Sequence, residues 1–180
     1  MTYWNIDQIC ETSGSTPNGY GDCWLHGGKD CLATVEDKRE RVQRVARGQL
    51  GIRWKHQGRT VNGVDCIGLV LTTGRLLNIP NCDFEMKNYR REPDGITLNE
   101  ILSKYMVRKS KGSMLSGDVL EFNQIDYKWP IHVAFLCNSY MGYQTMIHSL
   151  MTERKVVEHR YDRSWVDKTV AVFEFEGIND

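Results

Sequence analysis

The sequence has no long apolar run and no excess of charge of one sign. No stretch approaches the roughly 20 apolar residues that a membrane-spanning helix needs. Lys and Arg together number 23, as do Asp and Glu, so the formal net charge is zero. No basic stripe marks a surface for nucleic acid, and residues 1–30 lack the apolar core of a secretion signal. We therefore expect a soluble protein without a secretion signal, a membrane span or a nucleic-acid partner.

Cysteine is too sparse and too scattered for the disulfide framework of a small secreted protein. The chain has six cysteines, and half of them lie in the first fifth of the sequence. Free thiols are therefore the expected state. A second interpretation stays open for one set, because zinc or an iron–sulfur cluster could be held by Cys10, Cys23, His26 and Cys31. Their spacing, however, is not a standard pair of Cys-x-x-Cys motifs.

Two regions of different composition divide the chain. Residues 1–34 are rich in Ser, Thr, Asn, Pro and Gly and show little hydrophobic periodicity, which predicts an irregular N-terminal docking arm. Residues 35–180 carry periodic apolar residues, and with 41% hydrophobic residues the chain can bury one core. The sequence thus predicts an arm followed by one domain.

Helical patterns come first in this domain, and strand patterns follow. Apolar residues recur at helical spacing over 42–50, a largely apolar run covers 66–77, and residues 97–100 form a capping-box pattern before a further helix. The charged residues among 38–47 are expected on the solvent side of the first helix. Strands are predicted at 118–122, 131–137, 143–149, 154–160 and 169–175. Helices followed by an antiparallel run of strands indicate an α+β fold.

Cys66 has the sequence context of a nucleophile. Asp65 occupies the N-cap position of the apolar helix, so Cys66 opens that helix. Unpaired N–H groups and partial positive charge at a helix N-terminus lower the pKa of a thiol, and the thiolate is the reactive form. Gly68, in the first turn, allows backbone or substrate to approach closely. The alternative is that Cys66 is a small buried core residue.

Two histidines later in the chain fit the roles of a base and its partner. A hairpin that turns about residues 139–141 sets His132 directly opposite His148 on one face, with Cβ atoms about 5 Å apart. His132 would then take the proton of Cys66 and later return it, while His148 orients the His132 ring. Both could instead be ordinary half-buried strand histidines. His159, among charged neighbours, is expected at the surface.

Several ordered motifs resemble a known family. Residues 51–70, which end in Val64-Asp65-Cys66-Ile67-Gly68-Leu69-Val70, resemble the signature of the NlpC family of papain-like cell-wall peptidases. The subgroup encoded in phage tail modules is the most similar. Residues 117–122, 131–134, 146–149 and 156–175 resemble the strands that follow in that family, so the resemblance covers roughly residues 36–176.

The resemblance implies both a fold and a chemistry. The implied fold is papain-like and α+β, with N-terminal helices packed on a C-terminal antiparallel sheet. Cys66 is implied as the nucleophile, His132 as the general base and acid, and His148 as the residue that orients His132. The implied reaction is hydrolysis of amide bonds in the peptide stems of peptidoglycan through a thioester, with no cofactor required for catalysis.

The chain departs from the family pattern close to the nucleophile. The family often has a Pro-Tyr pair where this chain has Arg53-Trp54, and Trp54 offers an indole N–H in place of a hydroxyl. Trp54, His56 and Asp65 are the candidates for lining the cleft, and segment 123–130 is a candidate for one of its walls. The backbone N–H of Cys66 is expected to be one oxyanion donor.

The phage subgroup implies a setting in a virus particle. The expected location is the virion tail, assembled in the host cytoplasm, with the arm docked on a tail-tip or hub protein and peptidoglycan as the substrate. Two alternatives stay open. The chain could be a structural tail-tip component that keeps the fold with little or no activity, or an acyltransferase that passes the thioester to an amine.

Overall fold

A computed structural model describes residues 37–82, 89–91, 96–123 and 130–178. The elements below all belong to the compact unit Lys38–Asp180. The predicted arm, with its cysteines and His26, lies outside the described residues, as do residues 124–129 of the proposed cleft wall. The predictions of an arm and of a wall therefore stay predictions.

The described residues contain four α-helices, one 3₁₀ turn and eight strands. The helices are α2 (Lys38–Arg47), α3 (Cys66–Leu76), α4 (Thr97–Tyr105) and α5 (Arg163–Lys168), and the 3₁₀ turn is η1 (Lys111–Ser113). The strands are β1 (Arg59–Thr60), β2 (Gly63–Val64), β3 (Val107–Lys109), β4 (Val119–Asn123), β5 (Pro130–Asn138), β6 (Gln144–Leu150), β7 (Lys155–Arg160) and β8 (Thr169–Glu174). None of the described helices has the length and apolar character needed to cross a membrane.

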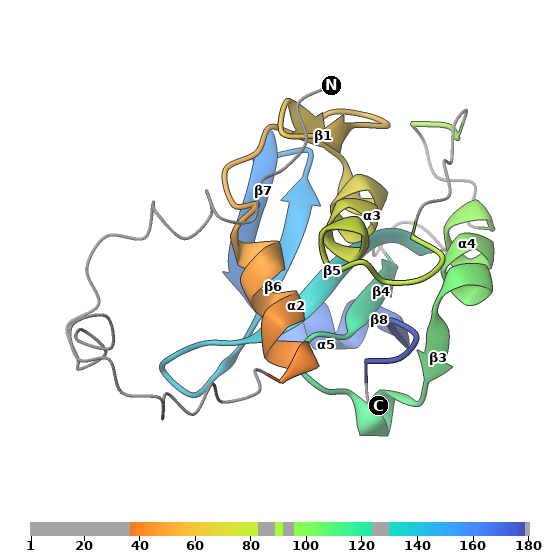
Figure 1. The fold of residues 1–180 in the computed structure, drawn as a ribbon. Helices are drawn as coiled ribbons and strands as arrows, with labels where there is room; N and C mark the ends of the chain where they lie inside the picture. The colour runs from red at the N-terminus through yellow and green to blue at the C-terminus, as the bar shows by residue number, and fades with distance from the viewer. Residues whose placement is uncertain (1–36, 83–88, 92–95, 124–129, 179–180) are drawn as a thin grey trace, which may run out of the picture. The chain divides into compact units, whose positions relative to one another are not determined.

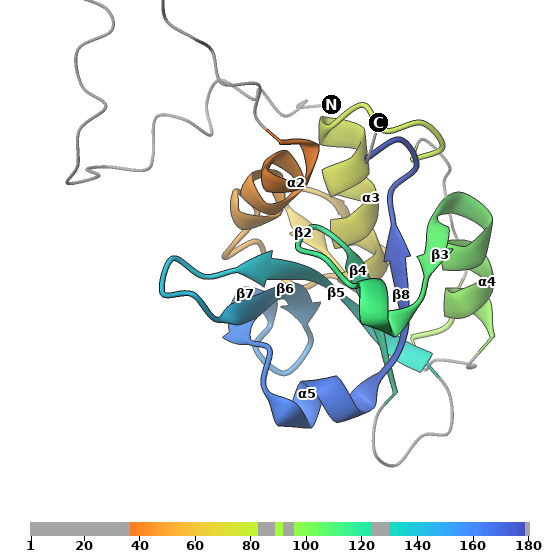
Figure 2. The same cartoon turned by 90° about the horizontal axis from the view of Figure 1, so that it is seen from below.

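Six strands form one antiparallel sheet that separates two layers of helix. The strand order is β3-β8-β4-β5-β6-β7, and β1 and β2 form a separate ribbon. Helices α2, α3 and α4 cover one face of the sheet, and α5 lies against the other, as a comparison of the two ribbon views shows (Figures 1 and 2). The fold is α+β, with helices packed on an antiparallel sheet, as predicted.

Side chains that alternate along β5 pack into the cores on both faces of the sheet. Val133, Phe135 and Cys137 are fully buried in the core beneath α2, α3 and α4. Ala134 and Leu136 are buried in the smaller core beneath α5. Successive residues of a strand point to opposite faces, so odd-numbered residues near the middle of β5 face the α3 side and even-numbered ones face the α5 side.

Most predicted elements are confirmed within two residues of their bounds, but one capping prediction is wrong. Helix α4 begins at Thr97 with Ile96 as its N-cap, and no side-chain hydrogen bond caps it. The capping box required Thr97 itself to be the N-cap. Strand β3 and helix α5 were not predicted, because both are too short to show a period.

The register of the β5–β6 hairpin also differs from the prediction. Phe135 pairs with Ile147 and Asn138 with Gln144, so extending this register sets His148 opposite Ala134 and not opposite His132. The shift amounts to two residues. Because side chains alternate with a period of two, the shift keeps both histidines on one face, as diagonal neighbours.

The cause of the shift is the length of the turn. The N–H of Ser139 donates to the carbonyl oxygen of Tyr143 at 2.8 Å, which closes the loop two residues later than a turn over 139–141 would. Gly142 has a φ of 81°, a conformation that glycine adopts without steric cost. The sequence pattern could not distinguish these two turn lengths.

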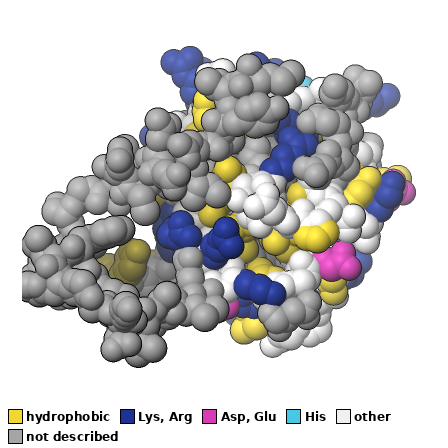
Figure 3. Space-filling view, viewed as in Figure 1, with side chains coloured by type: hydrophobic (Ala, Val, Ile, Leu, Met, Phe, Trp, Pro, Cys, Tyr) yellow, Lys and Arg dark blue, Asp and Glu magenta, His cyan; other side chains and the backbone are white. Residues whose placement is uncertain are grey.

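One charged residue of α2 is buried, contrary to the prediction for the helix as a whole. Lys38, Arg41 and Arg44 are exposed as expected. Arg39, however, lies 2.7 Å from Asp118 and 2.6 Å from Glu174, between the helix and the sheet. On the molecular face in Figure 3, the described Lys and Arg side chains lie in separate groups between apolar and uncharged ones.

Candidate active site

The start of α3 is built as the sequence predicted. Asp65 has extended backbone geometry, and its Oδ1 accepts a hydrogen bond from the N–H of Gly68 at 2.8 Å, which caps the helix. A Cβ atom on Gly68 would lie 2.1 Å from the carbonyl oxygen of Gly58. The close approach expected at Gly68 is therefore made by the backbone of the preceding loop, which packs directly on the first turn.

The thiol of Cys66 lies at this helix start, half-buried. Burial and, to a lesser extent, the charge of Asp65 raise the pKa of Cys66 to about 12, although the N–H groups of Val133, Ile67 and Cys66 itself act in the opposite direction. The expectation of a lowered pKa is therefore wrong for this resting structure. Desolvation outweighs the helix N-terminus, and Cys66 is a neutral thiol.

Three histidines form a hydrogen-bonded row across β5, β6 and β7. Nε2 of His132 lies 2.8 Å from Nδ1 of His148. Nε2 of His148 lies 3.1 Å from Nδ1 of His159. His148 is fully buried, and Trp165 of α5 packs edge-to-face on its ring at 5.4 Å. We call these three residues the histidine row.

Burial keeps the first two members of the histidine row neutral. Desolvation lowers the pKa of His132 to about 4. Desolvation, with the neighbouring His132 and His159, lowers the pKa of His148 to about 2. A neutral imidazole offers one N–H donor and one lone pair. His132 can therefore act as a base at neutral pH, provided that its free nitrogen carries the lone pair.

The nucleophile and the base candidate come from elements on opposite faces of the sheet. Helix α3 packs on the face of Val133, whereas the rings of His132 and His148 lie on the face covered by Trp165. The sulfur of Cys66 reaches the strand through the N–H of Val133, so it lies against the amide that joins His132 to Val133. This amide lies beyond Phe135–Ile147, the last pair of the β5–β6 ladder.

The thiol lies against the amide that follows His132 but is not hydrogen-bonded to the imidazole. Within the described part of the chain, no hydrogen bond joins Sγ of Cys66 to a histidine ring. Nδ1 of His132 is the ring nitrogen that His148 does not use, so it is the one left for the thiol. Catalytic hydrogen bonds are often long before substrate binds and shorten in the complex.

Asp65 is also the centre of a polar cluster beside the nucleophile. Its Oδ2 accepts from the backbone N–H of Gln57 at 2.6 Å and from the hydroxyl of Tyr89. Its Oδ1 accepts from Nη1 of Arg59 at 3.1 Å, and Nη2 of Arg59 donates to the Tyr89 hydroxyl at 3.0 Å. The carboxylate is thus paired with a cation and fully hydrogen-bonded. These hydrogen bonds tie the loop before α3 to the start of the helix.

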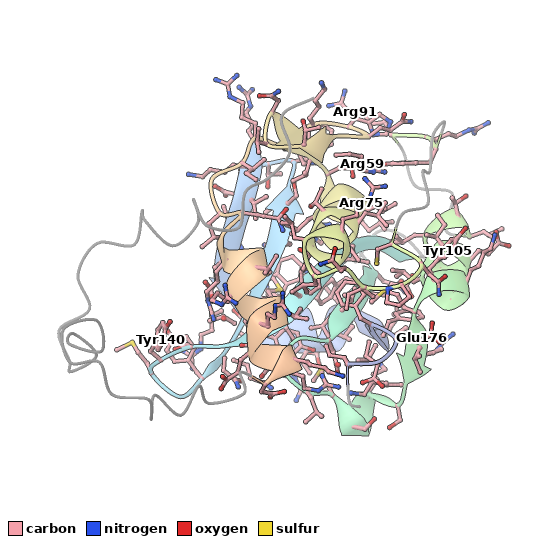
Figure 4. All side chains as sticks on the ribbon, viewed as in Figure 1. Arg59, Arg75, Arg91, Tyr105, Tyr140 and Glu176 are labelled. Carbon is pink, nitrogen blue, oxygen red and sulfur yellow. The ribbon has the colours of Figure 1, made fainter. Side chains whose placement is uncertain are left out.

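The predicted cleft residues Trp54 and His56 lie together at the edge of this cluster. Their rings stack with centroids 6.4 Å apart, and His56 also meets Tyr89 edge-to-face at 5.2 Å. The guanidinium of Arg91 lies 5.3 Å above the Trp54 ring. Figure 4 shows Arg59 and Arg91 near each other at the end of α3 nearest β1. Trp54 therefore contributes an aromatic face, and a tyrosine hydroxyl comes from Tyr89.

At the sequence level the chain matches no family model and no curated protein, but several solved structures are similar to it. An NlpC/P60 family protein from Bacillus cereus ATCC 10987 aligns over 76% of this chain with a TM-score of 0.56 and 20% identity. An NLP/P60 family protein from Staphylococcus aureus Mu50 aligns over 78% with a TM-score of 0.53 and 14% identity. The chain has the NlpC/P60 fold.

The extent of the match differs between these structures. The chain spans 40% of the length of the Bacillus cereus protein and 42% of the Staphylococcus aureus protein. It spans 98% of the NlpC/p60 domain of the peptidoglycan hydrolase SagA, with a TM-score of 0.50 and 14% identity. At this level of identity the similarity establishes only the NlpC/P60 fold. The activity must be argued from the residues of the site.

Within the NlpC/P60 fold, the structure adds three residues that the sequence analysis missed. Arg59 and Tyr89 hold Asp65, and His159 extends the row beyond His148. His159 is not simply a surface residue, as had been expected. His159 lies on the same face of the sheet as His132 and His148, and only the β6–β7 register, with Met146 opposite His159, could reveal that.

Metal ligation has no support in the described residues. Within residues 37–82, 89–91, 96–123 and 130–178, no three His, Cys, Asp or Glu side chains are grouped to hold a metal ion. The candidate set Cys10, Cys23, His26 and Cys31 lies outside these ranges. The zinc or iron–sulfur interpretation of that set therefore stays a prediction.

Proposed function

We propose that this chain is a cysteine peptidase that hydrolyses amide bonds in the peptide stems of peptidoglycan. The observation that carries the proposal is the 2.8 Å contact between Nε2 of His132 and Nδ1 of His148, which leaves Nδ1 of His132 for the thiol. Cys66, at the start of α3, lies against the amide that follows His132. The NlpC/P60 fold supports the substrate class.

The reaction follows from these positions. Nδ1 of His132 accepts the thiol proton while the sulfur of Cys66 attacks the amide carbon, and His148 accepts a hydrogen bond from the imidazolium that forms. The proton then passes to the leaving amine as the C–N bond breaks and a thioester remains. Water, deprotonated by His132, attacks the thioester and releases the acid and the thiol. The N–H of Cys66 is proposed as one oxyanion donor.

The reaction can begin from a neutral Cys66 thiol and a neutral His132 imidazole. Burial raises the pKa of Cys66 to about 12 and lowers that of His132 to about 4, so it favours a neutral thiol and a neutral imidazole before substrate arrives. The charges form together in the attack, next to the N–H groups at the start of α3. Stabilisation of developing charge by fixed dipoles is the larger part of many enzymatic rate enhancements.

We further propose that the protein works as part of a phage tail. The support is the similarity of the motifs at residues 51–70 and 117–149 to the phage tail-module subgroup. The arm at residues 1–34 would dock on a tail-tip or hub protein, and assembly would take place in the host cytoplasm. Immunogold labelling of purified virions, with an antibody to this chain, should label the tail. Label found only on lysed host debris would refute this placement.

The enzymatic proposal is tested by single substitutions assayed on purified cell wall. Cys66→Ala and His132→Ala are expected to lower release of new amino groups by at least about a thousandfold, because each removes a group that acts in the bond-breaking step. Cys82→Ala, which removes a buried thiol outside the site, should keep the activity. Circular dichroism checks the fold of each variant. Full hydrolysis by Cys66→Ala would disprove the assignment.

The second candidate is a structural tail component with the same fold. The observation in its favour is the half-buried, neutral thiol with no hydrogen bond to a ring among the described residues. It predicts that virions carrying Cys66→Ala assemble and infect normally, while removal of residues 1–34 blocks assembly. An acyltransferase would instead give amide product with an added amine faster than it gives hydrolysis.

A further inference from the structure

The histidine row ends at a residue that the proposed reaction does not use. His159 is half-buried on β7, the edge strand of the sheet, and its Nδ1 lies 3.1 Å from Nε2 of His148. The rings of His148 and His159 meet edge-to-face with centroids 5.0 Å apart. His159 has no contact with the thiol among the described interactions. Its effect on the site can come only through His148.

The hydrogen bonds of His148 to its two neighbours in the histidine row can have only two arrangements. It is fully buried, and both of its ring nitrogens face another histidine nitrogen. A neutral imidazole carries one N–H and one lone pair, so His148 must donate at one end and accept at the other. A buried donor or acceptor left without a partner costs about 1–3 kcal/mol, which disfavours any mixed arrangement. The hydrogen bonds of the row therefore all point the same way.

The direction of the row decides whether His132 can act as a base. If His148 donates from Nε2 to His159, its Nδ1 accepts from Nε2–H of His132, and Nδ1 of His132 carries the lone pair that the thiol proton needs. If the row is reversed, Nε2 of His132 accepts, and the proton of His132 sits on Nδ1, facing the thiol. Only the first direction permits proton transfer from Cys66.

We propose that His159 is a positioning residue that fixes the tautomers of His148 and His132 by accepting a hydrogen bond at Nδ1. The inference rests on the proposed function, because it assigns the direction that a base at His132 requires. His159 reaches solvent at the edge strand, so its own Nε2–H can be satisfied by water. The histidine row thereby links His132 to His159, whose outer ring nitrogen can bond to water.

Two substitutions at one position separate tautomer control from simple packing. His159→Asn keeps an acceptor close to the position of Nδ1, and His159→Leu removes it while keeping an apolar side chain of similar bulk. Imidazole ¹⁵N spectra report which ring nitrogen carries the proton. Wild type and His159→Asn are expected to show His132 and His148 protonated at Nε2. His159→Leu should show a mixture of tautomers at both residues.

The kinetic effect should follow the spectra. Loss of the outer hydrogen-bond partner of a metal-bound histidine commonly costs on the order of 10-fold to 100-fold. We expect the same order for the partner of a catalytic histidine, so kcat of His159→Leu should fall by at least about 10-fold with KM little changed. His159→Asn should recover most of kcat. Val157→Ala serves as the control, because Val157 lies opposite His148 on β7 without joining the row. It should leave both the spectra and kcat unchanged.

The outcomes also separate this inference from the proposed function. Unchanged tautomers in His159→Leu would overturn the inference, as would equal kcat values for His159→Leu and His159→Asn. If the wild-type protein hydrolyses nothing, the proposed function fails, and the spectra still decide whether His159 sets the tautomers.

Discussion

Replacing Gly68 by alanine should destabilise the protein, although the same change stabilises an ordinary helix. In a helix interior, alanine is favoured over glycine by roughly 1 kcal/mol. Here a Cβ would lie 2.1 Å from the carbonyl oxygen of Gly58, against 3.4 Å for ordinary contact. The added atom would also lie 2.9 Å from Arg59 and 3.1 Å from Asp65. The loop must therefore move by more than about 1 Å, and overpacking of this kind costs about 1–3 kcal/mol or more.

We expect a net loss of about 2 kcal/mol, because the obstacle is a backbone carbonyl that cannot change rotamer. In a chain of this size each kcal/mol lowers Tm by roughly 2–4 °C, so Tm should fall by about 4–8 °C. The moved loop carries Arg59, so hydrolysis should fall as well. Thermal unfolding followed by circular dichroism measures the effect.

A second glycine in the same helix provides a matched control. At Gly74 the added Cβ would meet the sulfur of Cys82 at 2.2 Å, a side chain that can itself be removed. Gly74→Ala should destabilise the protein, and the double variant with Cys82→Ala should recover part of that loss. No single side-chain truncation should rescue Gly68→Ala. An increase in Tm for Gly68→Ala would refute the close packing of the loop on α3.

Three further outcomes are expected. Burial raises the pKa of Glu121 above its usual value, so ionisation costs stability as pH rises through the folded pKa. Glu121→Gln, which can still accept from Asn99, should therefore gain stability over wild type between about pH 4 and about pH 8 in urea unfolding, and a constant difference would contradict this. Ser149→Ala should cost about 1–2 kcal/mol in the same assay, because its buried hydroxyl donates to the carbonyl of Val64 at 2.7 Å; a change within error would mean that water replaces the hydroxyl. Because the pKa of Cys66 is raised to about 12, its alkylation by iodoacetamide should keep accelerating well above the usual thiol pKa of about 8.5, and a plateau below about pH 8 would show that a thiolate is already formed.

The periodic parts of the fold could be predicted from the sequence. Helix α3 was predicted from one apolar run after Asp65, and the longer strands were predicted from alternation. The register of the β5–β6 hairpin was not predictable, because it depends on where Gly142 places the end of the turn. A register error of two residues leaves faces unchanged, and for this reason the pairing of His132 with His148 was predicted in spite of it.

The rest of the site depends on contacts that a sequence pattern does not contain. Tyr89 lies 24 positions from Asp65 and carries no motif of its own, yet its hydroxyl bonds that carboxylate. The helix N-terminus suggested a lowered pKa for Cys66, but the burial that reverses the direction exists only in the folded state. Arg39 looked like any other cation of an amphipathic helix until Asp118 and Glu174 were placed beside it.

The buried position of Arg39 has a consequence for behaviour in salt. The ion pair of Arg163 with Asp167 on α5 is largely exposed, with side chains 87% and 59% accessible, so mobile ions screen it once the Debye length falls to about 3 Å at about 1 M salt. Arg39 and Asp118 are 10% and 0% accessible, and Lys109 holds the second oxygen of Asp118 at 2.9 Å. Dissolved ions cannot enter between these groups. High ionic strength should therefore weaken the Arg163–Asp167 ion pair of α5 first, while the buried ion pair of Arg39 continues to hold α2 against the sheet.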